Sequence, residues 1–311
     1  MSNKEIFNCA VLSNKQIGEH FYKLRLEFTG AAAEVFSRFT PGQFVQIDVS
    51  SIALPPADKI PENLRDSAHR SILLRRPFSF ADVTAGSNRT TTELVYSVLG
   101  PATLRMTTLA AGQHLSVIGP LGNGFTIPQG KKLALLIIGG MGAPPLQNLA
   151  KVLSAEYTNI EVIVFVGAKT AKELPFERRL DALSQSLGFA IAEFAKHGIN
   201  SMIATDDGSV GYHGFVTDCL KKWLSEQAGF DAGAAIIYAC GPEPMLAEVA
   251  GIAKDRRIDC QVSTEQLMAC GIGLCQSCAV ECRIPNSNET VYKLCCEDGP
   301  VFDSKEMVFK L

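Results

Sequence analysis

The sequence lacks the long apolar runs that a membrane-spanning or secreted chain needs. No segment approaches about 18 uninterrupted apolar residues, and the richest run, Leu133–Ile138, ends in glycines. The N-terminal residues MSNKEIFNCAVL contain no apolar core of a signal peptide. We therefore expect a soluble, cytoplasmic protein that makes no contact with a membrane.

A strong net charge is also absent. The 29 Lys and Arg residues nearly balance the 32 Asp and Glu residues, which leaves a formal net charge of −3. Such a balance gives no basic surface of the kind that binds nucleic acid or anionic lipid. We therefore expect no nucleic-acid partner.

The chain is long enough for several domains, and its first part lacks helical periodicity. At 311 residues it exceeds the usual size of a single hydrophobic core. Residues 1–128 contain short alternating apolar segments between turns rich in Gly and Pro, which predicts an antiparallel β-barrel. Residues 51–70, rich in Pro, Asp and Lys, interrupt this pattern, and we interpret them as a surface insertion. The expected strands are Phe44–Val49, Glu93–Leu99 and His114–Ile118.

Residues 129–260 have a different character, because continuous apolar strands alternate with helical stretches. This order predicts a parallel α/β sheet. The expected strands are Lys131–Ile138, Ile160–Val166, Phe189–Phe194 and Ala234–Cys240. The expected helices are Leu146–Tyr157, Leu220–Leu224 and Pro244–Ala253.

Residues 261–311 form a short segment that is too small to bury much core and that contains six of the ten cysteines. In a reducing cytosol such a cluster indicates metal binding rather than disulfide bonds. Cys270, Cys275 and Cys278 follow the C-x₄-C-x₂-C spacing of plant-type [2Fe–2S] ferredoxins. Gly271 and Gly273 let the loop turn tightly around a cluster.

Two other interpretations of the cysteines remain, and so does a choice of fourth ligand. A zinc site would usually show a second C-x₂-C pair or paired histidines, whereas the nearest histidine here is His213. Inert buried thiols are the other alternative.

Cys282, Cys295 and Cys296 are all available as a fourth ligand, and spacing alone does not separate Cys295 from Cys296.

Three segments of the first part suit a flavin. Arg75-Arg76-Pro77-Phe78-Ser79 enters a strand, and arginine forms bidentate bonds with a diphosphate. Val95-Tyr96-Ser97 lies on the next strand, and the turn Gly100–Thr103 can offer backbone N–H groups to phosphate. The alternative interpretation of the first segment is a strand entry with an exposed arginine.

Two strand-to-helix turns suit a dinucleotide. Gly139-Gly140-Met141-Gly142-Ala143-Pro144-Pro145 follows one buried strand, and Ala239-Cys240-Gly241-Pro242 follows another. Ligands of open α/β sheets bind at the carboxyl ends of strands, so Gly140, Gly142, Cys240 and Gly241 are candidate NAD contacts. Cys240 is equally compatible with a buried structural thiol.

Together these motifs, in this order, resemble those of the electron transfer subunits of dihydroorotate dehydrogenase B, in the ferredoxin–NADP reductase superfamily. The resemblance covers nearly the whole chain. The motifs are RRPFS, GPLGNGF, GGMGAPPL, TDDGSVGYHGFVTD, ACGPEPML, ACGIGLCQSC and CEDGPVF. It implies an FAD-binding barrel (residues 1–128), an NAD-binding domain (129–260) and a [2Fe–2S] domain (261–311). It selects Cys296 as the fourth cluster ligand, and it implies FAD contacts at Arg76, Pro77, Phe78, Ser79, Val95, Tyr96, Ser97, Ala102 and Thr103.

The resemblance also implies an activity. A partner subunit would oxidise dihydroorotate at its FMN, in pyrimidine biosynthesis, and this chain would pass the electrons through [2Fe–2S] and FAD to NAD⁺. The expected assembly is a heterotetramer with two copies of each chain, and no residue here resembles a catalytic site for dihydroorotate. Two alternatives are the small subunit of another NAD(P)-linked iron–sulfur flavoprotein, such as a ferredoxin:NADP oxidoreductase or sulfide dehydrogenase, and a zinc-stapled binding module.

Overall fold

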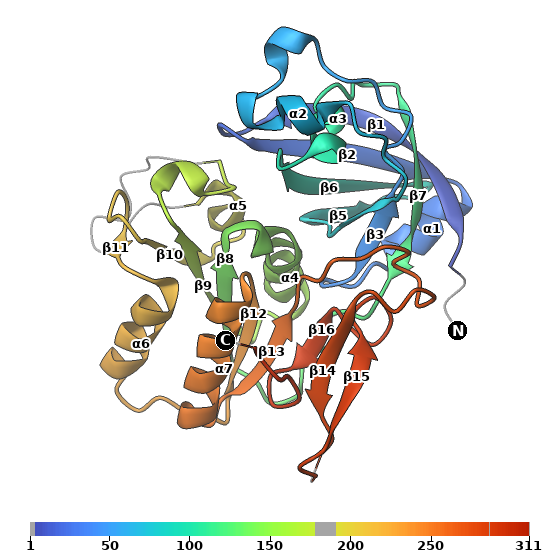
Figure 1. Ribbon diagram of the computed structural model, residues 1–311. Coiled ribbons are helices and arrows are strands. Elements are labelled where there is room, and N and C mark those ends of the chain that lie inside the picture. The colour runs from blue at the N-terminus through green and yellow to red at the C-terminus, as the bar shows by residue number, and fades with distance from the viewer. Residues whose placement is uncertain (1–3, 178–190, 286, 311) are drawn as a thin grey trace.

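A computed structural model describes residues 4–177, 191–285 and 287–310 of the chain. Its first part is an antiparallel sheet in the order β4-β3-β7-β1-β2-β6-β5, curved into a half-barrel (Figure 1). The antiparallel barrel architecture predicted from the sequence is confirmed. The strands are β1 (Ile6–Gln16), β2 (Phe21–Thr29), β3 (Phe44–Ile47), β4 (Arg76–Phe78), β5 (Asp82–Ala85), β6 (Arg89–Ser97) and β7 (His114–Leu121).

Strand β3 is buried on both of its faces. Val45 and Ile47 point into the core of the half-barrel. Phe44 instead packs in a cluster with the buried thiols Cys278 and Cys296 of the C-terminal segment. Because successive side chains of a strand point to opposite faces, β3 lies between the barrel core and the cysteine-rich segment.

Three short helices accompany this sheet, namely α1 (Ala31–Ser37), α2 (Arg65–Ala68) and α3 (Pro101–Met106). The expected insertion at residues 51–70 folds as two 3₁₀ turns, η1 (Ala57–Lys59) and η2 (Glu62–Leu64), followed by α2. Ile60, Leu64 and Ala68 pack against Leu104 of α3. The insertion therefore adds a small apolar cluster of its own to the barrel.

The second part is a mostly parallel sheet in the order β11-β10-β9-β8-β12-β13-β16. Its strands are β8 (Leu133–Gly139), β9 (Glu161–Ala168), β10 (Asn200–Thr205), β11 (Tyr212–His213), β12 (Ala235–Cys240), β13 (Asp259–Ser263) and the antiparallel edge strand β16 (Val301–Asp303). The other helical elements are η3 (Gly140–Gly142), α4 (Ala143–Glu156), η4 (Ala171–Glu173), α5 (Ala192–Ala195), α6 (Val216–Glu226) and α7 (Glu243–Arg256).

Both faces of the parallel sheet are covered, as its unbroken apolar strands require. Leu135 and Ile137 of β8 pack in one core with residues of α6 and α7. Leu136 and Ile138 pack in a second core with residues of α4 and α5. None of the helices in the described residues is long and apolar enough to span a membrane.

One predicted strand of this sheet is wrong. The segment Phe189–Phe194 begins outside the described residues, and its described part is Ile191 followed by the short helix α5. The third strand along the chain is β10 instead. Ile191 and Phe194 are buried beside α4, and a short apolar run does not by itself distinguish a buried helical turn from a strand.

The C-terminal segment joins both sheets. Strands β14 (Ala279–Arg283) and β15 (Thr290–Leu294) form a hairpin, while β16 returns to pair with β13, which runs across the expected boundary at residue 261. Asn123 Nδ2, just after β7, donates hydrogen bonds to the carbonyl oxygens of Asp298 and Val301 at 2.8 and 3.0 Å. In Figure 1 this segment, in red, lies beside the parallel sheet and beneath the half-barrel.

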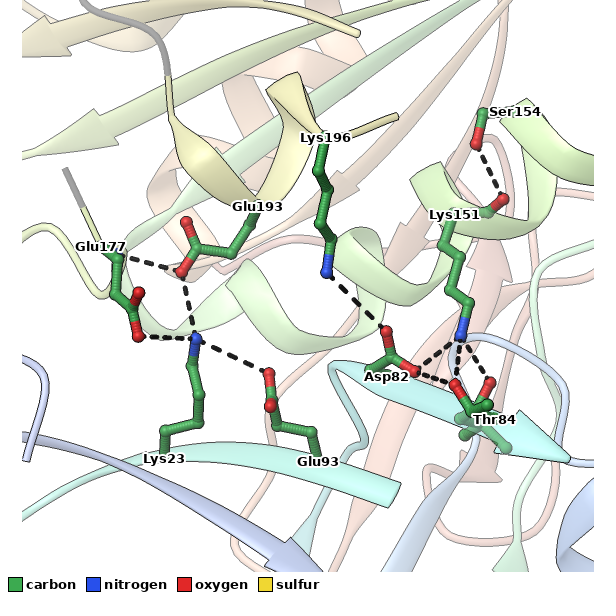
Figure 2. Close-up of polar contacts among 10 residues, drawn as sticks. Lys23, Asp82, Thr84, Glu93, Lys151, Ser154, Glu177, Glu193 and Lys196 are labelled. Carbon is green, nitrogen blue, oxygen red and sulfur yellow. Dashed lines mark hydrogen bonds and ion pairs between the residues drawn. The ribbon is translucent and has the colours of Figure 1, made fainter. Parts of the chain in front are cut away.

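A network of charges connects the half-barrel to the parallel sheet away from the cysteines (Figure 2). Lys23 of β2 contacts three carboxylates: Glu177 at 3.2 Å, Glu193 of α5 at 3.3 Å and Glu93 of β6 at 3.7 Å. Burial alone would lower the pKa of Lys23, but the attraction of the three carboxylates outweighs it and raises that pKa. The lysine therefore stays charged and holds the two parts together.

Lys151 of α4 makes the second connection in this network. Its Nζ lies 2.6 Å from Asp82 Oδ1 and donates further hydrogen bonds to Val83 O and Thr84 Oγ1, both at 2.8 Å. Lys196 approaches the other carboxylate oxygen of Asp82 at 4.0 Å. Lys151 thus satisfies three acceptors of strand β5 from a helix of the other sheet (Figure 2).

We predict that Lys151→Met lowers the free energy of unfolding by about 1–3 kcal/mol, because Val83 O and Thr84 Oγ1 lose this donor and the Asp82 carboxylate loses its nearest cation. The matched control is Lys172→Met. The Lys172 side chain is 80% exposed, and its Nζ lies as far as 4.0 Å from its partner, Glu19 Oε2. Its loss should therefore change the free energy of unfolding by less than about 0.5 kcal/mol. Urea unfolding of the three proteins measures both values, and equal effects would contradict the prediction.

Candidate redox site

A cavity of about 480 Å³ lies where the half-barrel, the parallel sheet and the C-terminal segment meet. Strand β4 and the residue after it contribute Pro77, Phe78 and Ser79 to its wall, and the end of β6 contributes Val95, Tyr96 and Ser97. Thr103 of α3 and Cys240 at the end of β12 complete the contributions that the sequence predicted. Residues of the predicted flavin segments and of the glycine-rich turn after β12 therefore line the same cavity.

Aromatic and hydroxyl groups shape this cavity. Tyr96 is 1% exposed, stacks on Tyr22 with a centroid separation of 5.4 Å, and donates its hydroxyl hydrogen to Asn14 Oδ1 at 3.2 Å. Burial raises the pKa of Tyr96, so its hydroxyl stays protonated. A flat apolar wall with a few hydroxyl groups is the kind of lining that suits an isoalloxazine ring.

Arg76 and Ala102 do not belong to the described lining of this cavity. Arg76 Nη1 donates to Leu74 O at 2.7 Å and to Arg75 O at 3.1 Å, which holds its guanidinium beside the chain that enters β4. Ala102 is buried in the barrel core. At the start of α3, the N–H groups of Leu99 and Gly100 already donate to Thr103 Oγ1.

The two glycine-rich turns of the parallel sheet touch each other. A Cβ at Gly142 would collide with the carbonyl oxygen of Cys240 and would lie 2.8 Å from Gly241 N. A Cβ at Gly241 would lie 2.9 Å from Gly139 Cα. The glycines therefore permit close approach of two backbones at the carboxyl ends of β8 and β12.

A second cavity, of about 560 Å³, opens beside these turns. It lies at the carboxyl edge of the parallel strands, which is where open α/β sheets bind nucleotides. Of the predicted NAD residues, Gly140 belongs to its wall, Cys240 to the first cavity and Gly241 to a smaller neighbouring one. The wall also carries Asp206, Asp218, Glu248, Glu173 and Lys169.

The cysteine loop has the backbone conformation that its glycines predicted. Gly271 and Gly273 have φ values of +69° and +87°, in the left-handed region that favours glycine. Cys270 Sγ accepts backbone N–H groups from Ile272 at 3.5 Å and from Cys275 at 3.4 Å. N–H groups that converge on a cysteine sulfur stabilise its thiolate, the form that binds iron.

The exposed thiol of the loop is acidified. The Ser277 hydroxyl lies 3.2 Å from Cys275 Sγ, and with contacts from Cys270 it lowers the pKa of the Cys275 thiol to about 6. This cysteine is therefore largely a thiolate near neutral pH.

The three candidates for the fourth ligand have different surroundings. Cys296 contacts the thiol of Cys278 and the backbone N–H of Gly273, and burial, followed by the Cys278 contact, raises its pKa to about 12. Cys295 turns the other way, toward Thr264, whose Oγ1 lies 3.4 Å from its sulfur. Cys282 lies on β14 with charged neighbours rather than other thiols. Cys270, Cys275, Cys278 and Cys296 therefore form one connected set of thiols.

This donor set fits a two-iron cluster. Four cysteines with loop N–H groups directed at sulfur are the ligands that a [2Fe–2S] centre uses. Within the described residues no three Cys, His, Asp or Glu side chains surround a single metal-ion position. The fit to a cluster therefore rests on the four thiols and on the loop N–H groups directed at sulfur.

The sequence did not indicate several residues of the first cavity. Ser263, Thr264, Glu265 and Gln266 line it, and Phe44 does so from β3. Burial raises the pKa of the Glu265 carboxyl. Ser263 ends the last parallel strand and the next three residues follow it directly. That position was the available signal, because that end of the sheet is where ligands gather.

The first cavity has a lining that suits a flavin (the flavin-type cavity), and the second lies where nucleotides bind (the nucleotide-type cavity). Together with the four-thiol loop, they define an iron–sulfur reductase with a ferredoxin reductase-like fold. Residues 265–308 match the family model "Iron-sulfur cluster binding domain of dihydroorotate dehydrogenase B", and residues 136–251 match "Oxidoreductase NAD-binding domain". The solved NADH-dependent reduced ferredoxin–NADP oxidoreductase has a similar fold, with a TM-score of 0.70 at 24% identity, over 99% of this chain and 92% of that one.

Curated relatives give the family. The chain is 36% identical over 300 residues to the dihydroorotate dehydrogenase B (NAD(+)) electron transfer subunit of Geobacillus sp. (strain WCH70), covering 96% of each chain. It is 33% identical over 301 residues to the protein of that name from Fusobacterium nucleatum, again covering 96% of each. The chain belongs to the family of dihydroorotate dehydrogenase B electron transfer subunits, and the resemblance noted from its motifs is confirmed.

We predict that Gly142→Ala lowers the free energy of unfolding by about 1–3 kcal/mol, because its methyl group would force apart the turns after β8 and β12. The φ of Gly142 is −66°, so the cost comes from lack of space rather than from backbone strain. The matched control is Gly251→Ala in α7, where a Cβ meets nothing within 4 Å. That change should stabilise the protein by up to about 1 kcal/mol, and a neutral Gly142→Ala would refute the packing argument.

We also predict that Cys296→Ser abolishes binding of the [2Fe–2S] cluster, whereas Cys295→Ser retains it. The reason is that the Cys296 sulfur contacts the Cys278 thiol, whereas the Cys295 sulfur lies against Thr264 Oγ1 at 3.4 Å. Iron content and the EPR spectrum of each anaerobically purified, reduced protein measure the outcome. A full cluster in Cys296→Ser would show that the assignment is wrong.

Proposed function

We propose that this chain passes electrons from an FMN-containing dihydroorotate dehydrogenase catalytic subunit to NAD⁺ in pyrimidine biosynthesis. Oxidation of dihydroorotate to orotate releases two electrons and two protons, and NAD⁺ takes up two electrons and one proton as a hydride. An iron–sulfur centre carries single electrons, so a flavin between it and the nicotinamide converts single-electron transfer into hydride transfer. The proposed assembly is a heterotetramer of two such chains and two catalytic subunits.

One observation carries this proposal: a single segment lines the flavin-type cavity and continues into the cysteine loop. Ser263–Met268 contribute to the cavity wall, and Cys270 follows two residues later. Cys295, beside Cys296, contacts Thr264 of the same segment. The two proposed redox centres are therefore neighbours, as transfer between them requires.

The surface beside the cysteine loop supports contact with a partner protein. Leu274 within the loop is 78% exposed, and Leu267 just before it is 91% exposed. Cys275 is exposed as well. Exposed leucines around a redox centre are typical of a protein interface, because they lose contact with water when the partner binds.

The second cavity supports NAD rather than NADP. Among the described residues of its wall, Asp206, Asp218, Glu248 and Glu173 contribute four carboxylates and Lys169 contributes one cation, while Lys221 pairs with both Asp218 and Glu248. A 2′-phosphate needs basic partners, and it would be repelled by this excess of negative charge.

The proposed assignment of the chain follows from these sites. Residues 1–128 would hold FAD, 129–260 would hold NAD and 261–311 would hold the cluster. We propose Cys270, Cys275, Cys278 and Cys296 as cluster ligands. The proposed cofactor contacts are Arg76, Pro77, Phe78, Ser79, Val95, Tyr96, Ser97, Ala102 and Thr103 for FAD, and Gly140, Gly142, Cys240 and Gly241 for NAD.

Reconstitution with an FMN-containing catalytic subunit tests the proposal. The complex should form NADH from dihydroorotate and NAD⁺, and the catalytic subunit alone should not. Leu274→Glu should weaken complex formation by about tenfold or more, while leaving the cluster EPR signal and the NADH-driven reduction of a small dye unchanged. Tyr292→Glu on β15, also at an exposed apolar side chain, is the matched control. Absence of NADH formation by the native complex would overturn the proposal.

A further inference from the structure

Gln46 is a buried polar residue whose amide group has no partner of its own. It lies in the middle of β3, its exposed fraction is 0%, and neither Oε1 nor Nε2 makes a hydrogen bond with any described residue. An unpaired buried amide costs free energy, so it calls for a physical explanation. Its neighbours Val45 and Ile47 point into the barrel core, which places Gln46 on the opposite face.

The side chain of Gln46 packs directly on the cysteine loop. A Cβ at Gly271 would overlap Gln46 Nε2 and would lie 2.7 Å from its Cδ. Gly271 stands between Cys270 and Ile272, whose N–H donates to Cys270 Sγ. The amide of Gln46 therefore lies against the backbone that holds a proposed cluster ligand.

The outward side chains of β3 reach both proposed redox sites. Phe44, two residues before Gln46, lines the flavin-type cavity and packs in the same cluster as Cys278 and Cys296. Lys4 fixes the far side of the loop, because its Nζ donates to Ile272 O at 2.8 Å. Gln46 is thus held between the barrel core and the loop, with its polar end at the loop.

We propose that Gln46 is a positioning residue for the iron–sulfur centre, and that its amide N–H donates a hydrogen bond to sulfur of the cluster or of its cysteine ligands. A reduced cluster carries one more negative charge than an oxidised one, so a donor at sulfur stabilises the reduced form and raises the reduction potential. This inference rests on the cluster ligation proposed above. It explains why a strand otherwise buried among apolar residues retains a glutamine.

The test is the reduction potential of the cluster in Gln46→Met, which keeps the length of the side chain and removes its donor. The equilibrium constant for reducing the cluster should fall by about tenfold, which is about 59 mV for one electron. EPR-monitored redox titration of the purified chain measures it, and the visible spectrum of the flavin gives an internal reference that should not move.

A matched control and a rescue variant separate hydrogen bonding from packing. Gln147→Met removes another buried amide with an unpaired nitrogen, on α4, and should leave the potential unchanged. Gln46→His keeps an N–H donor and should restore most of the potential. If Gln46→Met loses the cluster, Gln46→Leu replaces it in the comparison. Loss of the cluster in both apolar variants, with its retention in Gln46→His, also supports positioning.

Two results would overturn the inference. One is an unchanged cluster potential in a Gln46→Met protein that holds its full iron content. The other is loss of the cluster in Gln46→Met, Gln46→Leu and Gln46→His alike, which would assign Gln46 a packing role. A native chain that binds no [2Fe–2S] cluster would instead refute the proposed function, so the two failures are distinguishable.

Discussion

The burial of β3 on both faces is the constraint on which the arrangement of the redox site depends. Its inward side chains hold the barrel core, while Phe44 and Gln46 face the cysteine-rich segment. That segment has too few residues to fold around a core of its own. It gains its order by packing on β3 and by adding β16 to the edge of the parallel sheet. The cavity at the junction exists because all three parts meet there.

Ion pairs and close packing fix the half-barrel and the parallel sheet relative to each other on either side of this junction. Lys23 and Lys151 each satisfy several acceptors on the opposite part (Figure 2). Such half-buried ion pairs are screened by salt less than exposed ones. Removing one partner destabilises the protein, because it leaves the other charge without a counterion. At the other end, Gly142 lets the two ligand-side turns approach until their backbones touch. Hydride transfer needs a fixed geometry between flavin and nicotinamide, and these contacts provide a rigid frame for it.

Much of the fold could be predicted because its signals are local. Unbroken apolar strands such as β8 and β12 require burial on two faces, and glycine and proline mark where they turn into helices. The same local logic failed at Ile191–Phe194, where a short apolar run became a helical turn beside α4. Whether such a run extends or coils depends on the partner that covers it, which a sequence window does not contain.

The sequence by itself determined the chemistry of the site: three cysteines at ferredoxin spacing, glycines where the loop must turn left-handed, and a flavin-type motif on one strand. Spacing did not separate Cys295 from Cys296 as the fourth ligand, because spacing along the chain does not say which way a thiol points, and the choice of Cys296 came from the family resemblance. Only the tertiary structure turned Cys296 toward Cys278 and Cys295 toward Thr264. It alone brought Gln46 to Gly271 across more than two hundred residues, since contacts between distant segments arise from how the sheets pack and not from any local pattern.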